Sequence, residues 1–211
     1  MSSADGAADA APITHLLYLH GFRSSPQSTK ANKVGAWIAA HRPDVVWWCP
    51  QLAASPAAAM RDVFAGTAAW PSERMGVIGS SLGGFYATVV AERRRCRAVL
   101  LNPAVDPARD LASAIGTTTT WHSDEPFDFR AEYVDELRTL APPPVLADPD
   151  RILAVIATGD EVLSWQEMRA RYRDGQLRIV AGSDHALSDF DAHLPAVLAF
   201  LGLDVAPLSA R

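Results

Sequence analysis

The sequence has little cysteine, little net charge and no long apolar run, and each shortage excludes a class of protein. Its 211 residues include only two cysteines, which cannot form the disulfide framework of a small secreted domain and suit a reducing compartment. The formal net charge is −5, so no overall positive field attracts nucleic acid or anionic lipid. No apolar run reaches the roughly 20 residues that span a bilayer. These shortages predict a cytoplasmic protein without nucleic-acid or membrane partners.

The composition is that of one globular domain. Hydrophobic residues make up 49% and charged residues 20% of the chain, close to the averages of folded soluble proteins and enough for a sizeable core. Residues 1–12 have neither a basic start nor an apolar centre, so they predict a disordered tail rather than a signal peptide. We expect the folded domain to cover residues 13–205 and a short tail to cover 206–211. Nothing in the sequence indicates the oligomeric state.

Short apolar, β-branched runs alternate with helix-like segments along the chain. Such alternation predicts βαβ units, here a mostly parallel sheet of about six strands with helices on both faces. The expected strands are Ile13–Leu19, Val45–Cys49, Met75–Ile78, Ala98–Leu101, Arg151–Ala157 and Gln176–Val180. The expected helices are Ser28–His41, Pro56–Trp70, Leu82–Arg94 and Asp189–Leu201, in the last of which Pro195 marks either a kink or the true start.

The least regular part of the sequence runs from about residue 104 to residue 149. It holds a helical stretch, Arg130–Leu140, and the proline run Pro142–Pro144. A connection of this length is uncommon in a compact domain unless it forms a lid or a binding loop. We therefore expect a short lid insertion, with Trp121, Phe127 and Tyr133 lining the substrate pocket.

The strongest chemical signal is the run Gly79-Ser80-Ser81-Leu82-Gly83-Gly84, which fits the pattern G-x-S-x-G around Ser81. Side chains two positions before and after the serine would collide in the sharp turn that this motif requires, so Ser80, flanked by Ile78 and Leu82, does not qualify. The bare pattern arises by chance in about one chain in twenty of this length. In such a chain it would be a glycine-rich turn whose serine has no catalytic role. Here an expected strand ends before it and an expected helix begins after it, which is the context that a nucleophile needs.

A serine hydroxyl needs a base to take its proton and an acid to orient that base. In the α/β-hydrolase fold the chain order is serine, then acid, then histidine, and only His185 and His193 follow all plausible acids. His193 falls within the last expected helix, where a packed or solvated histidine is the ordinary outcome. His185 follows the last expected strand at the same sheet edge as Ser81, so we predict that it is the base.

Asp160 is the predicted acid because it follows the strand before the one that leads to His185. Asp106 follows the preceding strand and is the reserve candidate. Asp184 adjoins the histidine, and a neighbour in sequence seldom turns back to meet the imidazole. Glu161 is expected to cap or pair within its loop.

Two backbone N–H groups are also needed to stabilise the oxyanion of an acyl-transfer intermediate. One is expected from Leu82, directly after the nucleophile, and the other from Phe22 in the loop after the first strand. Gly21 would let this loop approach closely. His20 is expected to bond within the loop rather than to take part in catalysis.

Several motifs together resemble the YqiA-type esterases, which are small bacterial α/β-hydrolases. The resemblance covers most of the chain in the same order, and it rests on Tyr18–Phe22, Ser24–Ser28, Pro50–Leu52, Gly79–Gly84, Asn102–Ala104 and Gly159–Leu163. It implies a single α/β-hydrolase domain, esterase activity on short acyl chains, and Ser81, Asp160 and His185 as nucleophile, acid and base. The sequence differs from the usual family pattern at Arg23, at Ala186-Leu187 and over Thr117–Asp128.

Together these observations predict a serine esterase that forms an acyl-enzyme on Ser81, acts on a small-molecule ester or thioester, and uses no cofactor and no metal. A thioesterase, peptidase or transacylase could use the same triad. A non-catalytic binding protein on the same scaffold is the alternative of another class. A metal-dependent hydrolase is not indicated, because the histidines are scattered and no His-Glu-x-x-His motif is present. The glycine-rich loop also lacks the lysine of a phosphate-binding P-loop.

Overall fold

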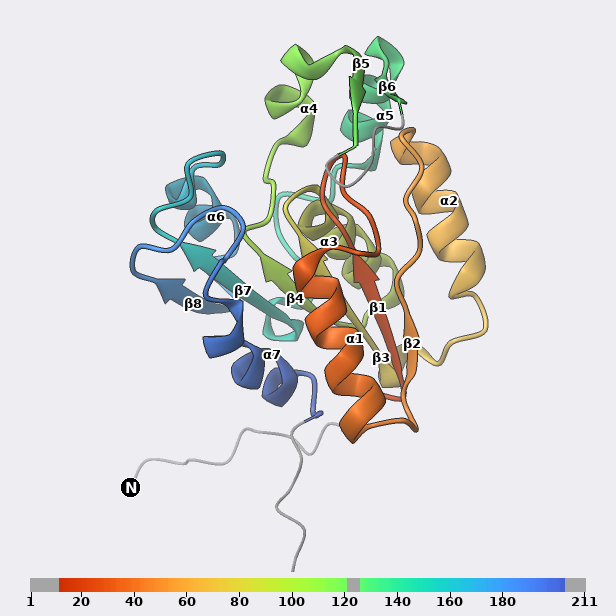
Figure 1. The fold of residues 1–211 in the computed structure, drawn as a ribbon, viewed down its shortest axis with the longest axis vertical. Helices are drawn as coiled ribbons and strands as arrows, with labels where there is room; N and C mark the ends of the chain where they lie inside the picture. Colours follow the sequence, from red (N-terminus) through yellow and green to blue (C-terminus); the bar gives the residue numbers. More distant parts are fainter. Residues whose placement is uncertain (1–11, 121–125, 204–211) are drawn as a thin grey trace, which may run out of the picture.

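The computed structural model describes residues 12–120 and 126–203, which form a parallel sheet between two layers of helices (Figure 1). The strands are β1 (His15–Leu19), β2 (Val46–Trp48), β3 (Met75–Ser80), β4 (Arg97–Leu101), β5 (Gly116–Thr119), β6 (Pro126–Phe129), β7 (Ile152–Ala157) and β8 (Gln176–Val180). The helices are α1 (Thr29–His41), α2 (Pro56–Gly66), α3 (Leu82–Arg94), α4 (Pro107–Asp110), α5 (Ala131–Leu140), α6 (Trp165–Arg171) and α7 (Leu194–Phe200). Short 3₁₀ turns cover Ser72–Arg74, Ala112–Ala114, Pro149–Arg151 and Phe190–Ala192.

The main sheet has the strand order β2-β1-β3-β4-β7-β8, and every neighbouring pair is parallel. This confirms the predicted α/β fold with about six strands. Because the strands are parallel, their carboxyl ends meet at one edge, and the loops after β1, β3, β4, β7 and β8 gather there. β8 is an edge strand that pairs with β7 alone.

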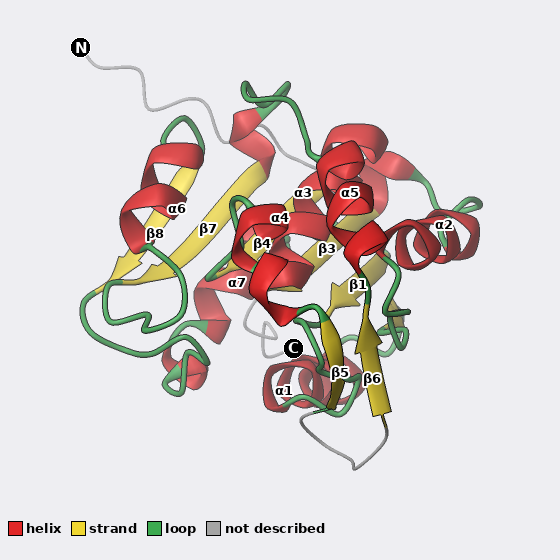
Figure 2. Cartoon of the chain, turned by 90° about the horizontal axis from the view of Figure 1, so that it is seen from above, coloured by secondary structure: helices red, strands yellow, loops and turns green. Residues whose placement is uncertain are grey.

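The strands bury side chains on both faces, which explains why they are continuous apolar runs in the sequence. In β1, Leu17 and Leu19 pack into the core beneath α2 and α3, whereas Leu16 and Tyr18 pack into the core beneath α1 and α7. Seen from above, α1 and α7 lie on one side of the sheet and α2, α3 and α6 on the other (Figure 2).

The segment between β4 and β7 lies over the carboxyl edge of the sheet (Figures 1 and 2). It contains α4, the antiparallel hairpin β5–β6 and α5. The Glu136 carboxylate of α5 accepts hydrogen bonds from the Ser55 hydroxyl at 2.7 Å and from the Ala57 N–H at 2.9 Å. These bonds fasten the predicted lid segment to the first turn of α2.

Some expected boundaries were wrong. The second helix ends at Gly66 rather than Trp70, and the next residue, Thr67, is its C-cap. The last helix begins only at Leu194, so Pro195 lies in its first turn, where its missing N–H costs nothing. The hairpin β5–β6 and helix α6 were not predicted.

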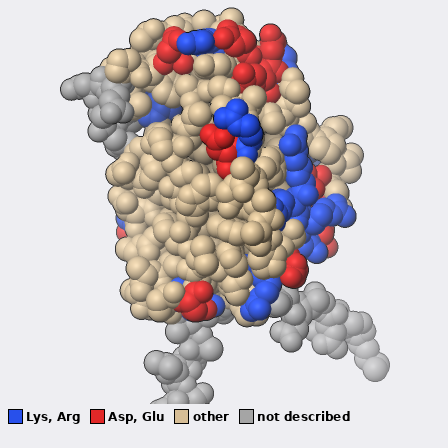
Figure 3. Space-filling view, turned by 90° about the vertical axis from the view of Figure 1, so that its right-hand side faces the viewer, with Lys and Arg blue, Asp and Glu red and all other residues tan. Residues whose placement is uncertain are grey.

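Charged side chains are unevenly distributed over the surface. On the face shown in Figure 3, charged side chains of both signs border an area with few of either. No helix in residues 12–120 and 126–203 is long and apolar enough to cross a membrane.

Candidate active site

Ser81 occupies a strained turn between β3 and α3. Its backbone angles are φ 56° and ψ −121°, a conformation that a residue with a side chain adopts only where the surroundings enforce it. A Cβ atom on Gly79 would lie 2.0 Å from the Gly83 carbonyl oxygen, and one on Gly83 would lie 2.0 Å from the Leu19 carbonyl oxygen. The two glycines of the motif are therefore required by backbone contacts, as the sequence indicated.

The loops after β7 and β8 are joined side by side. The Gly159 N–H donates to the Gly182 carbonyl at 3.0 Å, and the Gly182 N–H donates to the Thr158 hydroxyl at 2.9 Å. A Cβ atom on Gly159 would lie only 2.3 Å from the Ser183 carbonyl oxygen. This close approach brings the residue after Gly159 and the loop after Ser183 together.

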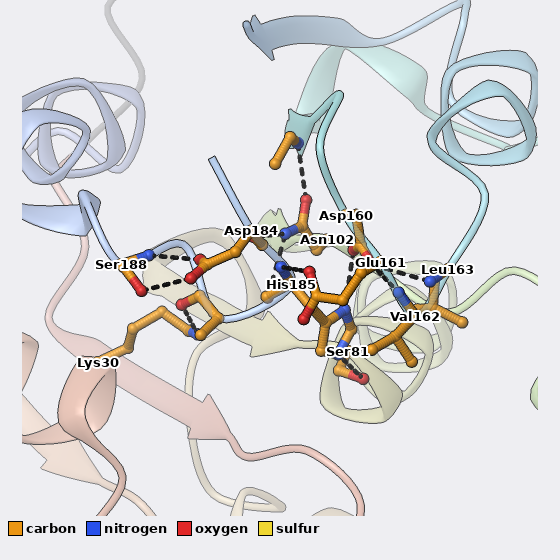
Figure 4. Close-up of polar contacts among 12 residues, drawn as sticks. Lys30, Ser81, Asn102, Asp160, Glu161, Val162, Leu163, Asp184, His185 and Ser188 are labelled. Atoms are coloured by element: carbon orange, nitrogen blue, oxygen red, sulfur yellow. Dashed lines mark hydrogen bonds and ion pairs between the residues drawn. The ribbon is translucent and has the colours of Figure 1, made fainter. Parts of the chain in front are cut away.

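Asp160, His185 and Ser81 form a continuous chain of hydrogen bonds at the carboxyl edge (Figure 4). His185 Nδ1 lies 2.8 Å from Asp160 Oδ2, and His185 Nε2 lies 3.0 Å from Ser81 Oγ. A carboxylate accepts the proton of Nδ1, which leaves Nε2 as the acceptor of the serine hydroxyl. This is the tautomer that a general base requires.

The Asp160 side chain has no exposed surface. Oδ1, the oxygen that does not face His185, also accepts hydrogen bonds. Oδ1 accepts the backbone N–H groups of Val162 at 2.9 Å and Leu163 at 2.8 Å. These two donors fix which oxygen faces the imidazole. They also satisfy an oxygen of a side chain that lies away from water.

Sequence reasoning assigned no role to Asn102, which is fully buried directly after β4. Its side-chain amide donates to the carbonyls of Asp184 at 3.0 Å and His185 at 3.1 Å, and its oxygen accepts the Ala157 N–H at 2.8 Å. Asn102 thus ties the histidine loop to the ends of β4 and β7. A polar residue after an apolar strand at this edge was the available signal. Glu161 adds a further bond, because its carboxylate accepts the His185 N–H at 3.0 Å.

The competing acids and bases are bonded elsewhere. His193 is buried and bonds to Asp189 at 3.1 Å and to Arg178 at 3.2 Å. Asp106 caps α4 by accepting the Arg109 N–H at 3.2 Å.

Asp184 accepts the backbone N–H of Ser188 at 2.8 Å and its hydroxyl at 2.6 Å. These two hydrogen bonds lower the pKa of the Asp184 carboxyl. They hold the loop that carries His185.

Phe22 and Leu82 both line the cavity into which Ser81 opens. Leu82 is the first residue of α3, so its N–H has no acceptor within the helix. A Cβ atom on Gly21 would lie 3.9 Å from Ser81 Oγ, which shows how near the loop after β1 approaches.

His20 stabilises that loop. Its Nε2 accepts the Leu52 N–H at 3.1 Å, so Nδ1 carries the proton and donates to the Gly21 carbonyl at 3.0 Å.

The cavity beside Ser81 has a volume of about 390 Å³. Part of its wall is apolar and comes from the predicted lid segment and the loop after Asp160, namely from Ala104, Pro107, Leu111, Val162 and Leu163.

Of the aromatic residues expected in the pocket, Phe127 and Tyr133 do not line this cavity. Phe127 instead lines a smaller hollow that shares Phe22 and Leu82 with the cavity. Phe127 meets the Phe22 ring edge-on at 5.1 Å between centroids, and Tyr133 packs against Phe129 at 5.7 Å. Phe127 therefore packs against Phe22 in the loop after β1. Trp121 lies outside the described residues.

The parallel sheet covered on both faces, with its strained serine turn, is the architecture of the α/β-hydrolase fold. The model of the uncharacterised protein family UPF0227 matches residues 15–202. The chain belongs to this family, which confirms the resemblance to the YqiA-type esterases.

Solved structures with the same architecture include proteins from very different organisms. Alpha/beta hydrolase domain-containing protein 10 from mouse is 16% identical, with a TM-score of 0.65 over 87% of each chain. Est1E from Butyrivibrio proteoclasticus is 14% identical, with a TM-score of 0.66 over 90% of this chain and 87% of that one. The Pyrococcus furiosus esterase Pf2001 is 16% identical, with a TM-score of 0.61 over 92% of this chain and 82% of that one. At such identities the likeness shows the fold alone.

Proposed function

We propose that the protein is a serine esterase that cleaves small carboxylic esters through an acyl-enzyme on Ser81. The observation that carries the proposal is the unbroken chain of hydrogen bonds from Asp160 through His185 to Ser81. A buried carboxylate, an imidazole in the right tautomer and a strained serine at the mouth of a cavity are the parts that acyl transfer needs. The resemblance to esterases over most of the chain supports the same conclusion.

In the first half-reaction, Ser81 Oγ attacks the ester carbonyl carbon while its proton passes to His185 Nε2. The imidazolium that forms is stabilised by the Asp160 carboxylate, which stays ionised. The negative oxygen of the tetrahedral intermediate accepts hydrogen bonds from the N–H groups of Leu82 and Phe22. Removing one such donor typically lowers kcat by about 10²–10³-fold. His185 then protonates the leaving alcohol, and the acyl group stays on Ser81.

In the second half-reaction, water attacks the acyl-enzyme carbonyl while His185 again takes a proton. Collapse of the second intermediate releases the acid and returns the proton to Ser81. The segment from about residue 104 to 149 acts as a short lid, because its Pro107 and Leu111 line the cavity. A cavity of about 390 Å³ is near the lower end of the roughly 300–1,000 Å³ typical of small-molecule sites, which favours short acyl chains.

Labelling with a fluorophosphonate followed by peptide mapping tests the assignment. Such a reagent phosphonylates a serine that an adjacent base activates, so the adduct is expected on Ser81. The matched control is Ser80, the neighbouring serine, which has a different place in the turn. An adduct on Ser80, or no adduct on the folded protein, would overturn the proposal. Heat-unfolded protein should remain unlabelled.

A further inference from the structure

Lys30 places a positive charge in the cavity beside Ser81. Among the described residues that line this cavity, it is the only lysine or arginine. It is the second residue of α1, and its ammonium group donates to the Ala186 carbonyl at 2.5 Å. Figure 4 shows it reaching from α1 toward the loop of His185.

No carboxylate in the described chain forms an ion pair with this ammonium. The neighbouring carboxylates are engaged elsewhere, since Asp160 binds His185 and Asp184 binds Ser188. Burial lowers the pKa of Lys30 to about 8, against the opposing influence of these two acids. A partly desolvated ammonium with one backbone partner and two further N–H donors has capacity left for an anion.

Two residues that carry hydroxyl groups, Tyr18 and Ser28, line the same cavity. The Tyr18 side chain is fully buried, and the Ser28 and Ser80 hydroxyls lie beside its phenol. Because hydroxyl hydrogens rotate, these neighbouring hydroxyls can bond to one another, and they give the wall around Lys30 a polar character.

The N-terminus of α1, which lies next to Lys30, also favours an anion. Ser28 is the N-cap of α1 but makes no side-chain capping bond, and the first turn of this helix has no acidic residue. The positive end of the helix dipole is therefore not neutralised by a side chain at this point. The acid that does line the cavity, Asp110, is paired with Arg109.

We propose that the cavity holds an anion subsite centred on the Lys30 ammonium, so that the preferred substrate is a small ester carrying a carboxylate or another anionic group. The apolar wall with Pro107, Leu111 and Leu163 would contact the uncharged part of such a molecule. This proposal names the substrate class of the esterase site and rests on the proposed function.

Matched esters that differ only in charge test the subsite. Monomethyl glutarate carries the carboxylate on the acyl side, and methyl glutaramate is its neutral counterpart. The pair γ-acetoxybutyrate and γ-acetoxybutyramide places the same difference on the alcohol side. Hydrolysis is followed in a pH-stat for the wild type, Lys30→Met, Lys30→Arg and the control Lys33→Met. Lys33 lies one turn further along α1, is paired with Asp191 and does not line the cavity.

The quantity compared is the ratio of kcat/KM between the anionic and the neutral ester, because a general effect of losing the bond to Ala186 cancels in it. The wild type and Lys33→Met are expected to prefer the anion of at least one pair by about tenfold or more, the effect of one charge-assisted hydrogen bond. Lys30→Met should lose this preference and Lys30→Arg should keep part of it. The preference should also fade as the pH rises through about 8, where Lys30 loses its proton.

A wild type with no preference in either pair, or a preference that survives Lys30→Met, would overturn the subsite. If no ester is cleaved at all, the proposed function fails. The anion subsite is then tested separately by measuring the binding of glutarate. Glutarate should raise the Tm of the wild type, because it binds only the folded state, and should leave that of Lys30→Met unchanged. An equal rise in both proteins, or none in the wild type, would contradict the proposal.

Discussion

Replacing Asp160 with asparagine tests the catalytic geometry most sharply, because the structure dictates how the amide must lie. In the native protein, Oδ1 accepts two backbone N–H groups, from Val162 and Leu163, and Oδ2 faces His185 Nδ1. An amide NH₂ group facing two N–H donors would break both hydrogen bonds, each worth about 0.5–1.5 kcal/mol, and would set donors against donors. In the Asp160→Asn variant, the amide oxygen would therefore keep the inner position and the NH₂ group would point at the imidazole.

An NH₂ group donates a hydrogen bond, so it selects the histidine tautomer in which Nδ1 is the acceptor and Nε2 carries the proton. Nε2 is then unable to accept the proton of Ser81. The expected loss is about 10³–10⁴-fold in kcat, as found where this tautomer is imposed on a serine triad. KM should change little, because Asp160 does not line the cavity.

The assay is steady-state hydrolysis of a chromogenic short-chain ester, with NMR of the imidazole nitrogens of His185 in the same samples. NMR should find the proton on Nδ1 in the wild type and on Nε2 in the variant. The matched control is Asp106→Asn, which should lower kcat by less than about tenfold because asparagine caps a helix as well as aspartate does. The reasoning would be refuted by an Asp160→Asn variant with wild-type kcat, or by a large loss of kcat in Asp106→Asn.

Three other experiments, on triad variants, on thiol alkylation and on acyl-chain length, test the proposed mechanism. Ser81→Ala and His185→Ala should each lower ester hydrolysis by about 10⁴-fold or more, whereas His193→Ala should leave kcat nearly unchanged; steady-state kinetics of the three variants would expose a misassigned base. Burial raises the pKa of the Cys49 and Cys96 thiols to about 12, so little thiolate forms at pH 8 and iodoacetamide should not reduce turnover of the native enzyme; inactivation that tracks alkylation would contradict the mechanism. In a series of p-nitrophenyl esters, kcat/KM should peak at short acyl chains, and a rise continuing beyond about eight carbons, at about 0.8 kcal/mol per buried CH₂, would show a longer acyl channel than the cavity provides.

The sheet could be predicted from the sequence because its strands are covered on both faces and therefore appear as apolar runs. The positions of Ser81, Asp160 and His185 followed from the same reasoning, since each lies in the turn or loop after a predicted strand. Their mutual distances come from the structure.

Other features depend on contacts that no local pattern reports. Helix α6 is a single short element, Trp165–Arg171, in which helical periodicity has little room to show. The hairpin strand Gly116–Thr119 is largely exposed and lacks an apolar alternation. The role of Asn102 arises only where the ends of β4 and β7 meet the loop after β8. The direction of the Phe127 ring is likewise set by tertiary packing.

The position of β8 affects how the proposed catalytic function would fail under stress. The strand has one hydrogen-bonded neighbour, and most of its side chains are exposed. His185 sits in the loop that leaves this strand, whereas Ser81 is anchored at the centre of the sheet. Elements with few buried contacts open locally at a lower free energy than the whole domain. Brief detachment of the β8 edge would thus interrupt catalysis while the central strands stay folded, and amide hydrogen exchange in β8 would report the fraction of molecules that are temporarily inactive.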